Sequence, residues 1–389
     1  MVYDYIIIGA GIAGLYAAYN LKNKYPDKTF LVLEANSKKY IGGRVRQKMF
    51  NNHLVNTGAG IGRKHKDKYL IELLNELKIK YTEFSKEPKY SFEPVDFKKI
   101  IITLKNKFKE LNKPRETFKE FAQPILGSEI YKKFVRTSGY TDFENDDVEH
   151  VLYMYGLEDN TCCWSGLSIS WNQLITKLID KIDSVNIKSN SQVIKIENND
   201  IISVLTEKKE YKCNKLIVAT TIKSLRKLFK NPIYKEIEGQ PFILIYATIA
   251  KKYIPIMKDK INGSLIVNSK LHRIISIDPD KGLYIIAYSD NKDAVSLKKH
   301  VDDKKYLEDL LKKALNIDDI KLNKVVHYYH IIGTHYYKPL LNIYKSRLEF
   351  IKQAQHPDTN TYVIGEVVSE NQGWVNSAFD TFHKISKYL

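Results

Sequence analysis

The pattern of apolar and polar residues divides the N-terminal part of the chain into a strand, a helix and a second strand. Residues 5–8 form a short, mostly β-branched apolar run followed by glycines, which is typical of a buried parallel strand. Residues 12–21 continue with helical spacing and include alanines small enough to pack closely on a sheet. A second strand at 29–33 ends at Glu34. This order predicts a βαβ unit and hence an α/β fold.

The rest of the chain alternates between helical and strand-rich regions. Apolar residues at helical spacing predict an amphipathic helix within 66–79 and further helices through 90–135. From residue 241 onward, short alternating runs separated by turn residues predict an antiparallel sheet. The other expected strands are 185–188, 191–196, 201–206, 212–220, 242–249, 264–267, 273–277, 283–289 and 324–331, and the other expected helices are 171–178, 303–314 and 377–387.

A GxGxxG motif lies in the turn after the first strand. Gly9 would permit the tight turn, Gly11 would leave room for a pyrophosphate, and Gly14 would let helix and strand approach each other. The helix N-terminus offers free N–H groups and a positive dipole end to phosphates. Glu34 suits a ribose diol and would repel a 2′-phosphate, which disfavours NADP. The order of these elements predicts dinucleotide binding, and the alternative is a βαβ unit without a ligand.

Two further glycine-rich segments follow. Gly42 and Gly43 stand before Arg44, so backbone and guanidinium could close over a diphosphate, although an ordinary turn has the same composition. Residues 54–63 form a second glycine-rich strand end, suited to a large ligand that lies against bare backbone. A nicotinamide dehydrogenase is a weaker alternative, because its ligand explains neither the segment at Gly42, Gly43 and Arg44 nor the later pair Gly365 and Glu366.

Together with 362–366 (YVIGE) and 373–378 (GWVNSA), these motifs resemble the flavin-containing amine oxidase superfamily, which includes monoamine and polyamine oxidases and viral and algal relatives. The resemblance implies an α/β fold, with a FAD-binding Rossmann-like domain and a second α+β substrate domain made of an antiparallel sheet and helices. It implies a discontinuous FAD-binding domain at 1–68, 172–235 and 340–389, and a substrate domain at 69–171 and 236–339.

The resemblance also implies the residues that hold FAD. Glu366 would bind hydroxyls on the ribityl or ribose side, and the backbone of 374–376 would meet the pyrimidine edge of the flavin, where a helix N-terminus stabilises negative charge. The implied cofactor-binding residues are Gly9, Gly11, Ile12, Ala13, Gly14, Glu34, Ala35, Gly42, Gly43, Arg44, Gly58, Ala59, Gly60, Ile61, Val193, Ala219, Gly365, Glu366, Trp374, Val375 and Asn376.

The same family uses an aromatic slot and a lysine next to flavin N5. Trp374 matches one wall of the slot, and Tyr336 and Tyr337 are candidates for the other, with core or surface positions as the alternative. At the lysine position this chain has Leu244 or a neighbour, which cannot hold a water that links N5 to a cation. Because no cysteine follows Cys213, we expect non-covalent FAD; a histidyl link through His335 is a weaker alternative.

The composition indicates which partners and which cellular location to expect. The chain has 389 residues and a formal net charge of +17, from lysines spread along its length. Without a dense basic block, we expect a solvated surface and no nucleic-acid partner. The three cysteines, Cys162, Cys163 and Cys213, have no metal-like spacing and suggest reduced thiols. With neither a leader nor about 18 consecutive apolar residues, we expect a soluble protein in the cytoplasm of a host cell, or in a virion if the source is viral.

Two classes of function remain open from the sequence. The leading hypothesis is FAD-dependent oxidation of an amine, either a polyamine or an amino-acid-like compound, to an imine with O2 as acceptor. On the same fold, a desaturase or a protoporphyrinogen-type oxidase is an enzymatic alternative. A flavin-binding protein with little turnover is the alternative outside enzymes, because the lysine near N5 is replaced. Segments 138–143 and 152–157 are aromatic and could line a substrate cavity, although core tyrosines are commoner.

Overall fold

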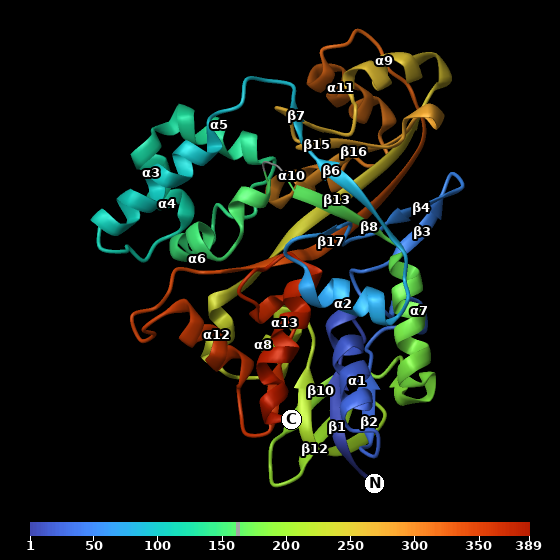
Figure 1. Ribbon diagram of the computed structural model, residues 1–389, viewed down its shortest axis with the longest axis vertical. Helices are drawn as coiled ribbons and strands as arrows, with labels where there is room; N and C mark the ends of the chain where they lie inside the picture. Colours follow the sequence, from blue (N-terminus) through green and yellow to red (C-terminus); the bar gives the residue numbers. More distant parts are fainter. Residues whose placement is uncertain (161–163) are drawn as a thin grey trace.

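The computed structural model of the chain describes residues 1–160 and 164–389. Its elements form a lower and an upper sheet-based part, with a helical part beside the upper one (Figure 1). Cys162 and Cys163 lie outside the described residues. Cys213 is buried and free.

The lower sheet contains the predicted βαβ unit. β1 (Val2–Ile8) lies between β2 (Phe30–Leu33) and β12 (Glu210–Val218) and runs parallel to both. The sheet is completed by β9 (Ile187–Lys188) beside β2, β18 (Thr361–Val363) beside β12, and the antiparallel strands β10 (Val193–Glu197) and β11 (Ile202–Thr206). The predicted meander is confirmed, and the sheet joins both ends and the middle of the chain.

The glycine turn after β1 brings the strand and the following helix into close contact. Gly9 has a φ of +103°, and a Cβ there would lie 2.4 Å from the carbonyl oxygen of Ala219. A Cβ on Gly14 would lie 2.0 Å from the carbonyl oxygen of Gly9. Both positions therefore require glycine. Gly11 differs, because no atom lies within 4 Å of a Cβ built at that position.

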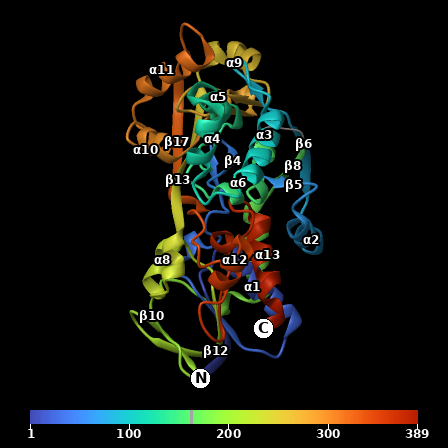
Figure 2. The same ribbon diagram turned by 90° about the vertical axis from the view of Figure 1, so that its left-hand side faces the viewer.

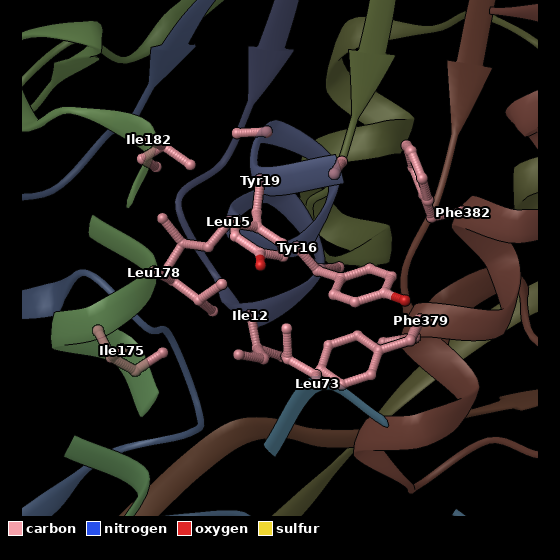
Figure 3. Packing of buried hydrophobic residues seen from close by; sticks show 14 of the residues in the cluster. Ile12, Leu15, Tyr16, Tyr19, Leu73, Ile175, Leu178, Ile182, Phe379 and Phe382 are labelled. Carbon is pink, nitrogen blue, oxygen red and sulfur yellow. The ribbon is translucent and has the colours of Figure 1, made fainter. Parts of the chain in front are cut away.

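The helix that begins at this turn is the centre of the lower core. α1 (Ile12–Lys24) packs between α7 (Trp171–Ile182) and α13 (Val375–Ile385), as Figure 3 shows. The ring of Tyr16 stacks on Phe379 with the centroids 4.1 Å apart. Each fully buried apolar side chain of this kind contributes roughly 1.5–3 kcal/mol. The first, middle and last segments of the chain therefore stabilise one another.

Two long strands join the upper sheet to the lower part of the molecule (Figure 1 and Figure 2). β13 (Ile237–Ile249) and β17 (Leu322–Tyr337) are 13 and 16 residues long and pair antiparallel along their lengths. The sheet continues with β16 (Leu283–Asp290), β15 (Arg273–Asp278), β14 (Ser264–Ile266) and β7 (Lys89–Tyr90). The predicted antiparallel sheet is confirmed, with β7 added in parallel to β14.

Helices complete each part. Those that share a core with the upper sheet are α9 (Ile254–Lys260), α10 (Asn291–Lys298) and α11 (Lys304–Leu315). The helical part contains α3 (Phe97–Glu110), α4 (Phe118–Leu126), α5 (Ser128–Ser138) and α6 (Val148–Tyr153), which enclose their own aromatic core. The lower part adds α2 (Lys68–Glu76), α8 (Ile222–Leu228) and α12 (Arg347–Gln355). The predicted α/β fold class, with a Rossmann-like part and an α+β part, is confirmed; the domain bounds stay a prediction.

Several strands differ from the sequence prediction. β17 was expected at 324–331 but continues to Tyr337, through Gly333. A glycine usually marks a turn, but here a Cβ would lie 2.2 Å from the Cβ of Phe242, so this glycine permits close strand approach. β4 (His53–Asn56) lies at the start of the strand end expected at 54–63, but its hairpin with β3 (Gln47–Phe50) was not predicted. The small sheet of β5 (Gly62–Arg63), β6 (Tyr81–Lys86) and β8 (Trp164–Ile169) was not predicted either.

Among the described residues, no helix is both long enough and apolar enough to span a bilayer.

The glycine turn yields a matched pair of substitutions. We expect Gly14→Ala to destabilise the protein by about 1–3 kcal/mol or more, because the new methyl group overlaps backbone that cannot rotate away. Gly11→Ala should change the free energy of unfolding by less than about 0.5 kcal/mol, because its Cβ meets open space. Urea unfolding of both variants measures the difference; equal effects would contradict this account of the turn.

Candidate functional site

One cavity of about 900 Å³ connects the lower part of the molecule with the upper sheet. At the lower sheet it is lined by the glycine turn, by Glu34 and Asn36 after β2, and by Val193 at the start of β10. At the upper sheet it is lined by aromatic residues of β13, β16 and β17. This position, outside the carboxyl ends of parallel strands, is where open α/β sheets bind ligands.

Two glycine loops form the wall nearest α1. Gly11 and Gly42 pair as an isolated parallel bridge, and the N–H of Gly42 donates to the carbonyl of Ala10 at 2.8 Å. A Cβ on Gly58 would lie 2.1 Å from the carbonyl oxygen of Arg44, so the second glycine segment also packs directly on backbone. The first intrahelical bond of α1 joins the N–H of Leu15 to the carbonyl of Gly11 at 3.0 Å. The N–H groups before it have no partner within the helix.

Glu34 is fixed by donors from the glycine turn and from its own loop. Its carboxylate accepts from the N–H of Ala10 at 2.9 Å, from the N–H of Asn36 at 2.8 Å and from the side-chain amide of Asn36 at 3.0 Å. The residue is buried but lies on the cavity wall. Because a carboxylate has about four acceptor sites, it can accept further hydrogen bonds from a ligand.

Glu366, on the cavity wall, joins three separate segments of the chain. It accepts hydrogen bonds from the N–H of His335 at 2.8 Å, from Nδ1 of His335 at 2.6 Å and from the N–H of Gly373 at 3.2 Å. Arg44 donates to it at 3.1 Å and to the carbonyl of Gly333 at 2.6 Å. Burial opposes ionisation of Glu366, but His335 and Arg44 outweigh it and hold the pKa of Glu366 far below its usual range.

Both ring nitrogens of His335 are used. Nδ1 donates to Glu366, and Nε2 accepts from the N–H of Ile222 at 3.2 Å. The side chain is fully buried and is not part of the cavity wall. The histidyl linkage to FAD that the sequence left open is therefore disfavoured.

Trp374 is held from behind by a buried cation. The guanidinium carbon of Arg63 lies 3.8 Å from the centroid of the indole ring. Arg63 is itself paired with Asp67 at 2.7 Å and with Asp159 at 2.9 Å. Trp164 packs edge-on against Trp374 at 5.9 Å. These contacts hold the indole as a fixed wall of the cavity.

Asp142 is a carboxyl group at the aromatic end of the cavity. Burial, followed by the nearby carboxylate of Asp290, raises the pKa of Asp142 to about 8, although Tyr155 donates a hydrogen bond to it at 2.6 Å. At neutral pH this carboxyl group is therefore mostly protonated. Perturbed ionisable groups in a cavity are candidates for function.

His330 is a second ionisable group on the wall. It lies on β17, directly opposite Phe242 of β13, and its Nε2 donates to the carbonyl of Thr57 at 2.5 Å. Burial, and then the positive charges of Arg44 and Arg46, lower the pKa of His330 even though the hydrogen bond to Thr57 opposes this. The imidazole is therefore neutral at neutral pH.

Comparison with known structures identifies the fold. Over 100% of this chain and 99% of the other, it superposes on a double mutant of putrescine oxidase, made in a redesign of cofactor binding, with a TM-score of 0.79 and 14% sequence identity. The wild-type putrescine oxidase bound to putrescine gives a TM-score of 0.73 at 13% identity, with the same coverage. The chain has the putrescine oxidase fold.

Two sequence comparisons add to this. A family model described as an NAD(P)-binding Rossmann-like domain matches residues 7–77. An uncharacterised protein, R188 of Acanthamoeba polyphaga mimivirus, is 21% identical over 97% of this chain and 92% of its own length. The resemblance to amine oxidases is confirmed for the fold, and the expected likeness to viral proteins is confirmed by one of them.

In this putrescine oxidase fold, most of the predicted cofactor-binding residues share the one cavity. Those on its wall are Gly9, Gly11, Ile12, Ala13, Glu34, Ala35, Gly42, Gly43, Arg44, Gly58, Ala59, Gly60, Ile61, Val193, Ala219, Gly365, Glu366, Trp374 and Val375. Gly14 and Asn376 are not on the wall. Gly14 packs on Gly9, and the side chain of Asn376 accepts from the N–H of Leu70 at 3.1 Å. The roles of all these residues toward a cofactor stay predictions.

The predicted second aromatic wall is corrected. Neither Tyr336 nor Tyr337 lines the cavity. Tyr337 is fully buried in the lower core and donates to the carbonyl of Ser369 at 2.8 Å, and Tyr336 pairs with Glu238 across the strands. The reason is that the predicted strand ends at 331, whereas β17 continues to Tyr337 and strand alternation directs that side chain into the core.

The position of Leu244 is also corrected. Its side chain is buried against Val55, Tyr246 and Ile285 and does not reach the cavity. Phe242, two residues earlier in β13, lines the cavity instead. No ionisable group of β13 therefore replaces the family's lysine on the wall formed by the described residues.

Sequence reasoning missed several wall residues. Tyr140, Asp142 and Tyr155 come from segments for which cavity lining was the less favoured alternative, and their mixture of tyrosine, glycine and acid was the available signal. Other wall residues that were not predicted include Asn36, Arg46, Lys223, Lys227, Phe242, Tyr288, Tyr329 and His330. The sequence contained no signal for His330, since only strand pairing places it beside Phe242.

The hydrogen bonds of Glu366 make the stability of the protein depend on pH. In the folded protein the pKa of Glu366 is below its ordinary value of 4.5. The ionised carboxylate therefore stabilises the fold above pH 4.5, and this contribution is lost as the pH falls further. Glu366→Gln should destabilise the protein by about 3–5 kcal/mol near pH 7. The difference from the unsubstituted protein should shrink as the pH falls below 4.5.

Thermal unfolding between pH 3 and pH 7 measures this difference, with the exposed Glu207→Gln as the control. If the destabilisation by Glu366→Gln does not change with pH, the side chain of Glu366 stabilises the fold through its packing and not through its charge.

Proposed function

We propose that the protein is a FAD-dependent oxidoreductase that oxidises an amine to an imine with O2 as acceptor. The observation that carries this proposal is the continuity of the cavity: one space joins a dinucleotide cradle at the lower sheet to an aromatic chamber at the upper sheet. Binding of a nicotinamide dinucleotide would not explain why Glu366 and the start of α13 also lie on the wall of this cavity. The putrescine-bound neighbour of the same fold supports an amine as substrate.

The residues present fit a bound FAD. The open space at Gly11 and the free N–H groups at the start of α1 suit a diphosphate, with Arg44 adding a charge. Glu34 suits the hydroxyls of the adenosine ribose. The N-terminus of α13 at Val375 lies on the wall next to Trp374 and suits the pyrimidine edge of the flavin. Buried Thr220 Oγ1 and Gln372 Oε1, both from wall residues, have no hydrogen-bond partner within the described residues.

Bound FAD would supply the acceptor for the hydride equivalent that leaves the carbon next to the amine nitrogen, and O2 would regenerate it with release of peroxide. The chain's own residues then have three tasks. Trp374, Phe242 and Tyr288 exclude water from the reacting end and orient the amine. His330, uncharged at neutral pH, can accept a proton at Nδ1 as the amine loses its proton. β13 has no lysine, and His330 lies directly opposite Phe242 in the sheet and on the same cavity wall.

The first test of this proposal is spectroscopic. We expect purified protein to show flavin absorption, to release intact FAD on denaturation, and to lose the oxidised-flavin band when an amine is added without O2. Readmission of air should restore the band and produce peroxide. Bound flavin that no amine reduces would favour a flavin-binding protein with little turnover, and folded protein that does not take up FAD would overturn the proposal.

The diphosphate site assigned to the space at Gly11 can be tested separately. Gly11→Ala should retain the stability of the unsubstituted protein but bind FAD about 10-fold or more weakly, because its methyl group fills the space assigned to the diphosphate. Fluorescence titration of the apoprotein with FAD measures the affinity. Unchanged FAD affinity in this variant would place the diphosphate elsewhere.

A further inference from the structure

A cluster of four charged residues lies behind the Trp374 wall of the cavity. Arg63 is 4% exposed, and it pairs with Asp67 at 2.7 Å and with Asp159 at 2.9 Å. Lys66, which is more exposed, also pairs with Asp159, at 2.7 Å. We call these four residues the Arg63 cluster. It contains two cations and two carboxylates, so its formal charges cancel.

The cation that touches the wall is Arg63. Its guanidinium carbon lies 3.8 Å from the centroid of the Trp374 indole, which is contact distance. Trp374 lines the cavity, whereas Arg63 does not. Because the guanidinium covers one face of the ring, the indole presents its other face or its edge to the cavity. A ligand at this wall therefore has a buried cation directly behind the ring.

A buried ion cluster is not the simplest support for an aromatic ring. Replacement of buried ion pairs by apolar residues of similar volume is often neutral or stabilising in proteins. A long apolar side chain at position 63 would therefore support the indole equally well. The presence of arginine there indicates that its charge has a role of its own.

We propose that Arg63 is a specificity-determining residue that acts through Trp374: it makes this wall unfavourable for cations, so that the reacting end binds an amine in its uncharged form. This inference rests on the proposed amine oxidation and deepens it. An ammonium has no lone pair on nitrogen to assist the loss of a hydride equivalent from the neighbouring carbon. When an ammonium arrives, one N–H bond breaks, the electron pair stays on nitrogen, and the proton passes to solvent, directly or by way of His330.

The electrostatic reason lies in the charge distribution of the indole ring. Its faces are negative and attract cations, whereas its edge is positive. Arg63 already occupies one face, and its charge repels a second cation across the ring. Asp67 and Asp159 reduce this repulsion but do not cancel it, because they bind the guanidinium through its N–H groups, and Asp159 is shared with Lys66. An uncharged amine contacts the same ring without this repulsion.

Arg63 also has contacts that fix the shape of the wall. It donates to the side chain of Asn371 at 3.4 Å. The amide of Asn371 in turn donates to the carbonyls of Met154 and Tyr155, at 2.9 Å and 2.8 Å. Loss of the arginine therefore changes both a charge and a support. A test of the proposal has to separate these two effects.

The test compares two probes of nearly equal shape, choline and 3,3-dimethylbutan-1-ol. Choline carries a fixed positive charge, and its counterpart has carbon in place of the charged nitrogen. Neither probe is an amine that can become uncharged by losing a proton. Anaerobic calorimetry on the FAD-loaded protein gives both affinities, and their ratio measures how strongly the cavity favours or opposes a positive charge.

The decisive variant is Arg63→Met combined with Asp67→Asn, which removes one charge of each sign and leaves the cluster neutral. We expect it to shift the affinity ratio about 5-fold or more in favour of choline. Arg63→Lys keeps the cation and should leave the ratio within about twofold of its original value. The matched control is Lys64→Met with Glu83→Gln, an exposed pair with its charged atoms 2.7 Å apart, which should not change the ratio.

A second measurement needs no substitution in the cluster. tert-Butylamine has no hydrogen on the carbon next to nitrogen and therefore cannot be oxidised to an imine. If only its uncharged form binds, its affinity should rise about 10-fold for each pH unit between 7 and 9. Choline in the same pH series records the titration of the protein's own groups, which are the Arg63 cluster and, on the wall, Arg44, Asp142, His330 and Glu366.

Three results would each overturn the role of Arg63. These are an unchanged ratio in the double variant, a shift of equal size in Arg63→Lys, and an affinity for tert-butylamine that follows that of choline with pH. Bleaching of the flavin by 1-aminobutane, measured separately, tests the proposed function. The expected shift in the affinity ratio without bleaching would retain the role of Arg63 at this wall and reject amine oxidation.

Discussion

The buried carboxylate of Glu366 is the interaction on which the cavity depends. An ionised group 7% exposed is stable only when its acceptor sites are filled, and here the donors come from Arg44, His335 and the backbone of Gly373. These residues belong to the first glycine segment, to β17 of the upper sheet and to the loop before α13. Because one charge needs all of them, the two parts of the molecule meet at a fixed distance, and the space between the glycine turn and Trp374 keeps its shape.

The two carboxyl groups of the cavity differ because their neighbours differ. Glu366 lies between a guanidinium and an imidazole N–H, and it stays ionised despite burial. Asp142 has a tyrosine donor but faces another carboxylate, and burial keeps it protonated at neutral pH. The cavity wall therefore contains one carboxyl group that is ionised at neutral pH, Glu366, and one that is mostly protonated, Asp142. The charge of Glu366 holds the segments of the wall together, whereas the protonation state of Asp142 can change when a ligand binds.

The sequence predicted those features that depend on local backbone geometry. Gly9 and Gly14 are required by contacts within one βαβ unit, so their spacing alone revealed them. Glu34 follows β2 directly, and its position needed only the end of that strand. The β10 to β12 meander was also evident from alternation and turns. Each of these arises within about 30 residues of chain.

The predictions that were wrong concern residues whose positions depend on strand register and long-range packing. The predicted strand stops at 331, before Tyr336 and Tyr337, but β17 continues through Gly333, where Phe242 of β13 fills the missing side-chain volume. The same register brings His330 beside Phe242 and leaves Leu244 in the core. No local pattern records which residue of one strand faces which residue of another, so His330 was not recognised as a wall residue.

The strongly basic composition and a cationic substrate are physically compatible. The net charge of +17 is carried mostly by exposed lysines, and salt at physiological strength screens such charges beyond about 8 Å. Inside the cavity, water is replaced by aromatic rings and the effective dielectric is lower, so one carboxylate at contact distance outweighs many screened lysines. Lys223 and Lys227 do line the cavity, but they lie on α8, which directly follows Ala219 and Thr220, and Ala219 packs against Gly9 of the glycine turn. Their charge suits the phosphates of a dinucleotide, and the opposite sign is concentrated where the aromatic residues lie.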